Sequence, residues 1–288
     1  MMRVQSRLKE YTQANREAWN EVMPRHQKAA REKWDRAFMQ PGYVCIEGVE
    51  LDLLRRMGIK GRAVAHLLCN NGVELLSLKN LGAGECIGFD ISDAAIQEAR
   101  ERAEKCGIGC QFVRTDAYEI GPEYEGRFDV VYVSAGGLGW LPDLKSFFAR
   151  VAALLRENGQ VFIHEIHPFS EMLPFDDAQE TDVLRIVEPY FKAEPYIDYG
   201  GLDYVGGSQY SSTKPQYWFV HTLSDILMAL IENRIAIEHF SEYEADVSAG
   251  HERVEQAHAG IALSYVLIGR KESLNGRQTG VLGASGLG

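Results

Sequence analysis

The sequence of 288 residues lacks the features that mark several large classes of protein. No apolar run approaches the 18 residues that a membrane-spanning helix needs, and the polar N-terminal stretch has no signal-peptide core. The five cysteines include no CxxC pair, and no second pair of ligands at zinc spacing accompanies Cys106 and Cys110. We therefore expect a cytoplasmic protein with reduced thiols and no metal site.

Basic side chains are also scarce. Lys and Arg total 30 against 41 Asp and Glu, which gives a formal net charge of −11. Binding to a phosphate backbone needs clustered Lys and Arg, so nucleic acid is disfavoured as the main partner. We expect a small-molecule substrate, no nucleic-acid or membrane partner, and a monomer or a homodimer, between which the sequence does not choose.

An alternation of strand and helix patterns is the main feature that is present. Between Gly61 and Ile166 short apolar runs alternate with amphipathic stretches, which is typical of repeated strand–helix units and a parallel sheet. A late helix is expected at 222–233. The predicted strands are 62–68, 85–90, 110–114, 128–133, 160–166, 235–243 and 261–270, and the predicted helices between the first five are 72–81, 93–106 and 143–156.

The flanking segments differ in character from this core. Residues 1–38 predict one or two amphipathic helices, and residues 44–57 predict another, ended by Gly58. Residues 167–220 are rich in Pro, paired Gly and aromatics, as a functional loop would be. The expected organisation is an N-terminal helical lid (1–58), a core (59–166), an inserted cap (167–220), a final helix and two strands (221–272) and a disordered tail (273–288).

Polar groups that could bind a ligand lie at the ends of three of the predicted strands. The first strand leads into Cys69-Asn70-Asn71-Gly72 and then a helix, whose N-terminus would present free backbone N–H groups to an anionic ligand. Glycine at 72 would let the backbone approach that ligand closely. Asp90 ends the second strand, where Rossmann-like folds bind ribose hydroxyls. Asp116 follows the third strand and could accept a hydrogen bond from an adenine amino group, or could cap a helix instead.

The stretch 61–166 resembles the class I S-adenosylmethionine-dependent methyltransferases. The resemblance is closest to a branch of small bacterial enzymes, filed as methyltransferase type 11 or 12, whose first motif reads HLxCxxG. The matching segments are HLLCNNGVELLSLKNLGA (66–83), GFDISDAAIQEAR (88–100), FVRTDAY (112–118), FDVVYVSAGGLGWLPDL (128–144) and LLRENGQVFIHEIHP (154–168), with NREAWNEVMPRH (15–26) and WFVHTLSDILMALIENRIAIE (218–238) outside them. His66 stands where most relatives have an acidic residue, and Leu68 and Asn70 stand where they have glycines.

The resemblance implies a Rossmann-like, seven-stranded, mostly parallel sheet with helices on both faces, and S-adenosylmethionine as cofactor. It implies that Cys69, Asn70, Asn71 and Gly72 run beside the methionine part of the cofactor, with His66 in place of the acidic residue. Asp90 would hold the ribose, and Ile91 would pack on the adenine. The remaining implied contacts are Asp116 and Ala117 at the adenine, Ser134 near the methyl-bearing sulfur, and Tyr11 and Trp19 closing over the cofactor.

The acceptor side is less determined. His167, just past the fifth strand, could accept a substrate proton, although a structural role before Pro168 is equally compatible. His221 could act as a base or cap the late helix, and Tyr199 is a third candidate from the aromatic group that could close over a substrate. That group consists of Tyr190, Phe191, Tyr196, Tyr199, Tyr204, Tyr210, Tyr217 and Trp218.

Two other functions compete with methyl transfer. A nicotinamide-dependent oxidoreductase shares the ribose-binding carboxylate but would carry GxGxxG at the first turn, which HLLCNNG lacks. A non-catalytic binding module could retain the same fold without turnover.

Overall fold

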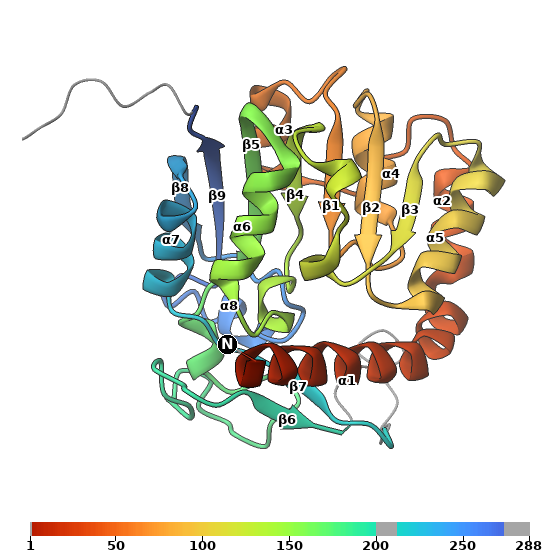
Figure 1. Cartoon of the computed structure of the whole chain (residues 1–288). Helices are drawn as coiled ribbons and strands as arrows, with labels where there is room; N and C mark the ends of the chain where they lie inside the picture. Colours follow the sequence, from red (N-terminus) through yellow and green to blue (C-terminus); the bar gives the residue numbers. More distant parts are fainter. Residues whose placement is uncertain (1, 200–211, 274–288) are drawn as a thin grey trace, which may run out of the picture.

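The computed structural model of the chain describes residues 2–199 and 212–273, with side chains from residue 7 onward. Its centre is a seven-stranded sheet with helices on both faces, which confirms the predicted fold class (Figure 1). The strands of this sheet are β1 (Val64–Leu67), β2 (Cys86–Asp90), β3 (Gln111–Arg114), β4 (Phe128–Val133), β5 (Leu155–Ile166), β8 (Ile235–Tyr243) and β9 (Ser264–Lys271).

The order of the strands along the sheet changes direction in its middle. The order is β3-β2-β1-β4-β5-β9-β8, and the pairs from β3 to β5 are all parallel. β9 runs antiparallel to both of its neighbours, β5 and β8. The order therefore switches direction between β1 and β4, and ligands bind at such a switch point, beyond the carboxyl ends of the strands.

Two layers of helices cover the sheet because its buried strands alternate apolar residues between the two faces. Ala65 and Leu67 of β1 pack in the core formed with α6 (Leu144–Leu154) and α7 (Leu223–Glu232). Val64 packs in the opposite core, which lies against α3, α4 and α5. These three helices span Gly48–Met57, Val73–Asn80 and Asp93–Cys106.

The N-terminal segment lies across the carboxyl edge of the sheet. It consists of α1 (Met2–His26), the π-helical segment η1 (Gln27–Arg31) and α2 (Glu32–Phe38), as the amphipathic pattern over 1–38 predicted. In Figure 1 the arrowheads of β2 and β3 point toward α1, and η1 and α2 then run up beside α5. Any ligand at the strand ends would therefore lie under α1.

The segment between β5 and α7 contains elements that the sequence did not predict. β6 (Tyr196–Asp198) and β7 (Gln216–Trp218) pair antiparallel and lie beside α1 (Figure 1). Tyr204, Tyr210 and the tail beyond Ser273 fall outside the described residues. The other short elements are η2 (Ala117–Glu119), η3 (Pro122–Tyr124), η4 (Leu138–Trp140), η5 (Ser170–Met172) and α8 (Glu252–Gln256).

The predicted boundary between the helix at 143–156 and the strand that follows it is wrong. The helix expected over 143–156 ends at Leu154, and β5 begins at Leu155, five positions before the predicted strand start at 160. Leu155 pairs with Phe128, and the register then shifts before Val130 pairs with Gln160. Asn158, at φ +60°, lies in this irregular stretch, so Asn158 and Gly159 form a bend within the strand rather than the end of the predicted helix.

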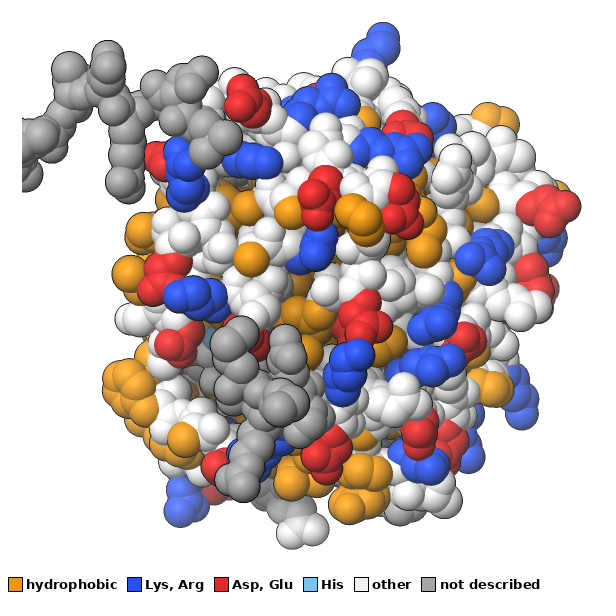
Figure 2. Space-filling model, viewed as in Figure 1, with side chains coloured by type: hydrophobic (Ala, Val, Ile, Leu, Met, Phe, Trp, Pro, Cys, Tyr) orange, Lys and Arg blue, Asp and Glu red, His pale blue; other side chains and the backbone are white. Residues whose placement is uncertain are grey.

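The surface that Figure 2 shows carries acidic and basic side chains interspersed, without a large area of one charge. Among the described residues no helix is long and apolar enough to cross a membrane.

Candidate functional site

The loop after β1 makes a tight turn into the N-terminus of α4. Leu68 and Asn70 both have positive φ, at +58° and +46°, and Gly72 follows at +77° as the residue that precedes the helix. The N–H of Gly72 donates to the carbonyl oxygen of Cys69 at 2.9 Å, which closes the turn. The first N–H groups of α4 are thereby aimed at the carboxyl edge of the sheet, where an anionic group could accept from them.

Glycine at position 72 is required by packing as well as by its backbone conformation. A Cβ there would lie 2.5 Å from the ring of Phe112 and 3.0 Å from the Cβ of Ala99. The side chain would therefore point into the core between β3 and α5. Contact with Phe112 is thus one reason for glycine at this position, and close approach of a ligand stays a prediction.

Asp90, at the end of β2, binds the backbone of two loops. Its Oδ2 accepts the N–H of Asn70 at 2.8 Å, and its Oδ1 accepts the N–H of Ser92 at 2.8 Å. Burial raises the pKa of Asp90, and these backbone donors oppose the shift. A carboxylate has about four lone-pair positions. The N–H groups of Asn70 and Ser92 take one position on each oxygen, and the N–H of Ile91, which follows half-buried, also acts as a backbone donor that lowers the pKa of Asp90.

Asp116 is a helix cap in the structure, which is the alternative that the sequence left open. Its Oδ1 accepts the N–H of Tyr118 at 3.0 Å and begins the short turn η2. Ala117, the first residue of that turn, is buried. Asp116 is half-buried at the end of β3, next to the strand that carries Asp90.

His66 and Ser134 face each other across β1 and β4. The Nε2 of His66 lies 3.2 Å from the Oγ of Ser134, while its Nδ1 is buried without a hydrogen-bond partner among the described residues. Burial lowers the pKa of His66 to about 3, so the ring is neutral at physiological pH. His66 therefore cannot supply the negative charge of the acidic residue that most relatives carry at this position.

The remaining loop residues take different orientations. Cys69 is fully buried, with its Sγ 2.8 Å from the position where a side chain on Gly88 would begin, so it packs against β2. The side-chain amide of Asn71 donates to Glu98 at 3.4 Å, and its carbonyl oxygen accepts from Arg102 at 2.8 Å. Cys69 and Asn71 thus offer backbone groups, rather than side chains, to a ligand at the edge.

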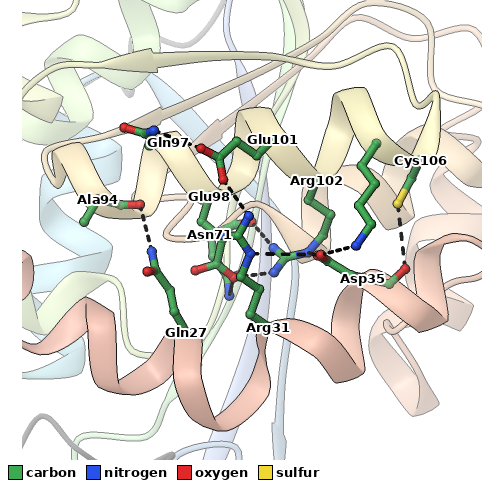
Figure 3. A network of polar contacts seen from close by, with 11 residues as sticks. Gln27, Arg31, Asp35, Asn71, Ala94, Gln97, Glu98, Glu101, Arg102 and Cys106 are labelled. Carbon is green, nitrogen blue, oxygen red and sulfur yellow. Dashed lines mark hydrogen bonds and ion pairs between the residues drawn. The ribbon is translucent and has the colours of Figure 1, made fainter.

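Arg102 anchors this loop to the N-terminal helices (Figure 3). It is fully buried in α5, donates to Asp35 of α2 at 3.0 Å, and also pairs with Glu98. Sequence reasoning missed this network. The available signal was the position of Arg102 on the apolar side of α5, beside the buried Ala99 and Ala103.

Polar contacts fix α1 over the site. Asn20 donates to Asp93 at 2.9 Å and accepts from the hydroxyl of Ser92 at 2.8 Å. Asn15 exchanges two hydrogen bonds with the backbone of Tyr217 in β7, at 3.0 and 2.7 Å. The helix is thereby tied to α5 on one side and to the β6–β7 pair on the other.

An aromatic wall extends from α1 to β7. Trp19 meets Trp140 with ring centroids 5.4 Å apart, and Trp140 meets Trp218 at 4.9 Å. The ring centroid of Tyr11 lies 4.7 Å from that of Tyr217 and 5.2 Å from that of Phe219. Tyr11 and Trp19 are therefore part of the layer that covers the strand ends, and their closure over a cofactor stays a prediction.

The three residues proposed for the acceptor side are not equally available. His167 uses both ring nitrogens, because its Nδ1 accepts the N–H of Phe169 at 3.1 Å and its Nε2 lies 2.9 Å from Glu242. The Nε2 of His221 lies 2.8 Å from the carbonyl oxygen of Leu141 and donates to it. Burial lowers the pKa of both histidines. Tyr199 follows β6 and is half exposed.

Glu165, at the end of β5, was not identified from the sequence. Its buried carboxylate accepts the N–H groups of Gly136 at 2.6 Å, Leu138 at 2.8 Å and Ile166 at 2.7 Å. It therefore fixes the loop that leaves β4 after Ser134. Nothing in the local sequence distinguishes this glutamate, because its partners lie 27 and 29 residues away.

Comparison with known proteins gives agreement in sequence and in fold. Residues 64–159 match the family described as a methyltransferase domain. The chain is 31% identical over 123 residues to the ubiquinone biosynthesis O-methyltransferase of Aromatoleum aromaticum, covering 42% of this chain and 52% of that protein. It is 32% identical over 137 residues to the ribosomal protein L11 methyltransferase of Neisseria gonorrhoeae, covering 47% and 40%. The chain thus spans about half the length of the curated relatives it matches.

The fold agrees over a larger part of the chain. The structure of an S-adenosylmethionine dependent methyltransferase from Mesorhizobium loti superposes with a TM-score of 0.56 at 21% identity, covering 77% of this chain and 98% of that one. At this identity the likeness concerns the fold.

Proposed function

We propose that the chain transfers the methyl group of S-adenosylmethionine to a small-molecule acceptor, a proposal supported by the match of residues 64–159 to a methyltransferase domain and by the strand order of the sheet. The observation that carries this proposal is the arrangement of Asp90 with the 68–72 loop at the switch point of the sheet. Asp90 holds the loop through one hydrogen bond on each oxygen, and the remaining acceptor capacity of the carboxylate would suit the hydroxyls of a ribose.

The chain contributes binding, orientation and exclusion of water. S-adenosylmethionine supplies an electrophilic methyl group on a sulfonium, which an acceptor attacks in line as the carbon–sulfur bond breaks and sulfur takes the electron pair. The backbone of residues 69–72 would receive the methionine end, and Asp116 and Ala117 would lie at the adenine. α1 and the aromatic wall would keep water from the reacting atoms, which assists an aligned displacement.

The cover over the strand ends supports a small acceptor. α1 is held by Asn15 and Asn20 on opposite sides of the site, and the wall of Trp19, Trp140 and Trp218 closes the space between. An acceptor as large as a folded protein would need an open edge. The name of one relative, a ribosomal protein L11 methyltransferase, makes a protein acceptor the alternative to test.

Calorimetric titration tests the first half of the proposal. S-adenosylmethionine and S-adenosylhomocysteine should both bind the full chain with a stoichiometry of about one, as one adenosyl site per domain requires. NAD, which shares the adenosine, is the matched competitor. Tighter binding of NAD than of S-adenosylhomocysteine would overturn the proposal in favour of an oxidoreductase.

Transfer of a radiolabelled methyl group tests the second half. Incubation with a fractionated metabolite extract should label compounds of low molecular mass, and a ribosomal protein fraction is the parallel sample. Label that enters only the protein fraction would refute a small-molecule acceptor.

A further inference from the structure

A small cavity lies between the carboxyl end of β5, the turn η5 that follows it and strand β7. Its volume is about 30 Å3, and its walls contain two carboxylates, one imidazole and several apolar side chains, without Lys or Arg. The polar members are Glu165, Glu171 and His221, and the aromatic members are Trp218 and Phe219.

The two carboxylates differ in the number of hydrogen-bond donors that they contact. Glu165 has three backbone donors, as described above. Glu171 is 7% exposed, and its Oε2 has no hydrogen-bond partner among the described residues. A buried carboxylate oxygen without a donor costs free energy and needs an explanation.

The electrostatics of Glu171 follow from its position. Burial, and then the neighbouring charge of Glu165, raise the pKa of Glu171 to about 7, and a hydrogen bond from the Trp218 side chain opposes this. Glu171 therefore exchanges a proton near neutral pH. Groups with that property in a cavity are suited to accept and release protons during a reaction.

His221 is the third polar residue that lines the cavity. His221 donates its Nε2–H to the carbonyl oxygen of Leu141, so this donor is already used. Burial lowers the pKa of His221, which favours the neutral form. The cavity thus presents acceptors and negative charge, and the chemical complement is a cation that donates hydrogen bonds.

Trp218 defines the size and character of this cavity. A Cβ on Gly139 would lie 2.6 Å from the Cη2 of the Trp218 indole, so the absence of a side chain at 139 lets the ring take its place. The N–H of Phe219 donates to the carbonyl oxygen of Gly139 at 2.7 Å, which holds β7 against the loop after β4. A volume of about 30 Å3 suits one water molecule, or an ammonium group of similar size.

The cavity lies beside the site proposed for the cofactor. Glu165 connects them, because it lines the cavity and binds the loop that begins at Ser134. β4 and β5 are neighbours, and β1, which carries the 68–72 loop, lies on the other side of β4. A group held by Glu171 would therefore be one strand away from the predicted position of the sulfur.

We propose that Glu171 binds the amino group of the methyl acceptor, and that the acceptor is a primary or secondary amine on an apolar or aromatic body. This inference rests on the proposed methyl transfer and specifies its substrate class. The ammonium form of the acceptor enters and gives one proton to the Glu171 carboxylate. The lone pair of the resulting neutral amine forms the new nitrogen–carbon bond while the carbon–sulfur bond breaks and its electron pair stays on sulfur. The product leaves as an N-methylammonium ion, and Glu171 returns its proton to water.

Binding of amine probes tests the proposal directly. The protein is saturated with S-adenosylhomocysteine and titrated calorimetrically with methylamine, phenethylamine, 2-phenylethanol and 3-phenylpropionate. At least one amine should bind, 2-phenylethanol should bind at least ~10-fold more weakly than phenethylamine, and 3-phenylpropionate should not bind. Failure of both amines to bind, or equal affinity for phenethylamine and 2-phenylethanol, would overturn the proposal.

Substitution and pH separate a binding role from a structural one. In Glu171→Gln the affinity for amines should fall at least ~10-fold, while cofactor affinity and the melting temperature are kept. Glu252→Gln, which removes an exposed carboxylate of α8, is the matched control and should change nothing. In the unsubstituted protein amine affinity should rise from pH 6 to pH 8 as Glu171 ionises, a result that does not depend on any variant folding. A flat pH dependence, or unchanged amine affinity in Glu171→Gln, would refute the role of Glu171.

The two proposals fail in different ways. If S-adenosylhomocysteine does not bind, methyl transfer is refuted, and amine binding to the chain alone still measures the cavity. If the cofactor binds and the amine results are negative, only the amine proposal is lost.

Discussion

Replacement of Asp90 by Asn tests whether the two carboxylate oxygens of this residue bind the ribose of the cofactor. The substitution keeps the shape of the side chain but leaves one acceptor oxygen where the carboxylate has two. The structure assigns one oxygen to the N–H of Asn70 and the other to the N–H of Ser92. In the variant an amide NH2 must face one of these N–H groups, so one contact to a loop is lost together with the charge.

The expected magnitude follows from the contacts that are removed. Hydrogen bonds to a charged group contribute about 1.5–3 kcal/mol each, and the loss of one contact to a ribose hydroxyl therefore weakens binding by ~10- to 150-fold. Part of this effect arises from the loop, because Asn70 would no longer be held by a full carboxylate.

A double-substitution cycle separates the two contributions. Calorimetry would compare S-adenosylhomocysteine with its 2′,3′-dideoxy analogue on the unsubstituted chain and on Asp90→Asn. If Asp90 binds the ribose, the analogue should lose much less affinity on substitution than S-adenosylhomocysteine does. Asp52→Asn, an exposed residue of α3, is the control for removal of one charge. Equal losses for both ligands, or an affinity for S-adenosylhomocysteine that stays within about twofold of the unsubstituted chain, would refute ribose binding by Asp90.

Three further outcomes are expected. Gly139→Ala should displace the indole of Trp218 and lower stability by about 1–3 kcal/mol, as overpacking does, measured by urea unfolding; an unchanged midpoint would contradict the contact. Asp35→Asn should cost about 1.5–3 kcal/mol in the same assay, because the fully buried Arg102 loses one of its two carboxylate partners and keeps Glu98, and an unchanged midpoint would contradict the contact. Burial raises the pKa of Glu74 to about 7 in the folded chain, against an ordinary value of 4.5. Its contribution to the free energy of unfolding is therefore largest below pH 4.5 and falls as pH rises to 7, by up to about 1.4 kcal/mol per pH unit. Urea unfolding at several pH values should show a smaller decrease in stability between pH 4.5 and 7 for Glu74→Gln than for the unsubstituted chain, and an equal decrease would contradict the raised pKa.

The sheet could be predicted from the sequence because its strands are short, apolar and separated by clearly amphipathic helices. Asp93–Cys106 was predicted to the residue, since Ser92 caps its start and Gly107 ends it in the left-handed conformation. The motifs predicted a methyltransferase, and residues 64–159 match the family described as a methyltransferase domain. The polar strand ends were also predicted, because the carboxyl ends of parallel strands meet at one edge whatever their separation in sequence.

The failures have a common physical cause, which is that they depend on partners far away in sequence. The start of β5 depends on pairing between Leu155 and Phe128. The contact between position 72 and the ring of Phe112, on another strand, was not predicted either. Glu171 stands in a segment without periodicity, and its environment is formed by Trp218, 47 positions later in the sequence, and by Glu165.

Arg102 has a consequence for how the chain can be shortened. Its guanidinium joins the carbonyl oxygen of Asn71 to the carboxylate of Asp35, and so joins the first turn of the proposed adenosyl site to the N-terminal helices. A truncated protein that begins after Asp35 would leave this cation with Glu98 as its remaining carboxylate partner, and water would enter between α5 and the loop. The first 35 residues are thus a requirement for the shape of the loop, and a minimal catalytic fragment designed around the matched domain alone should bind nucleoside poorly even where it folds.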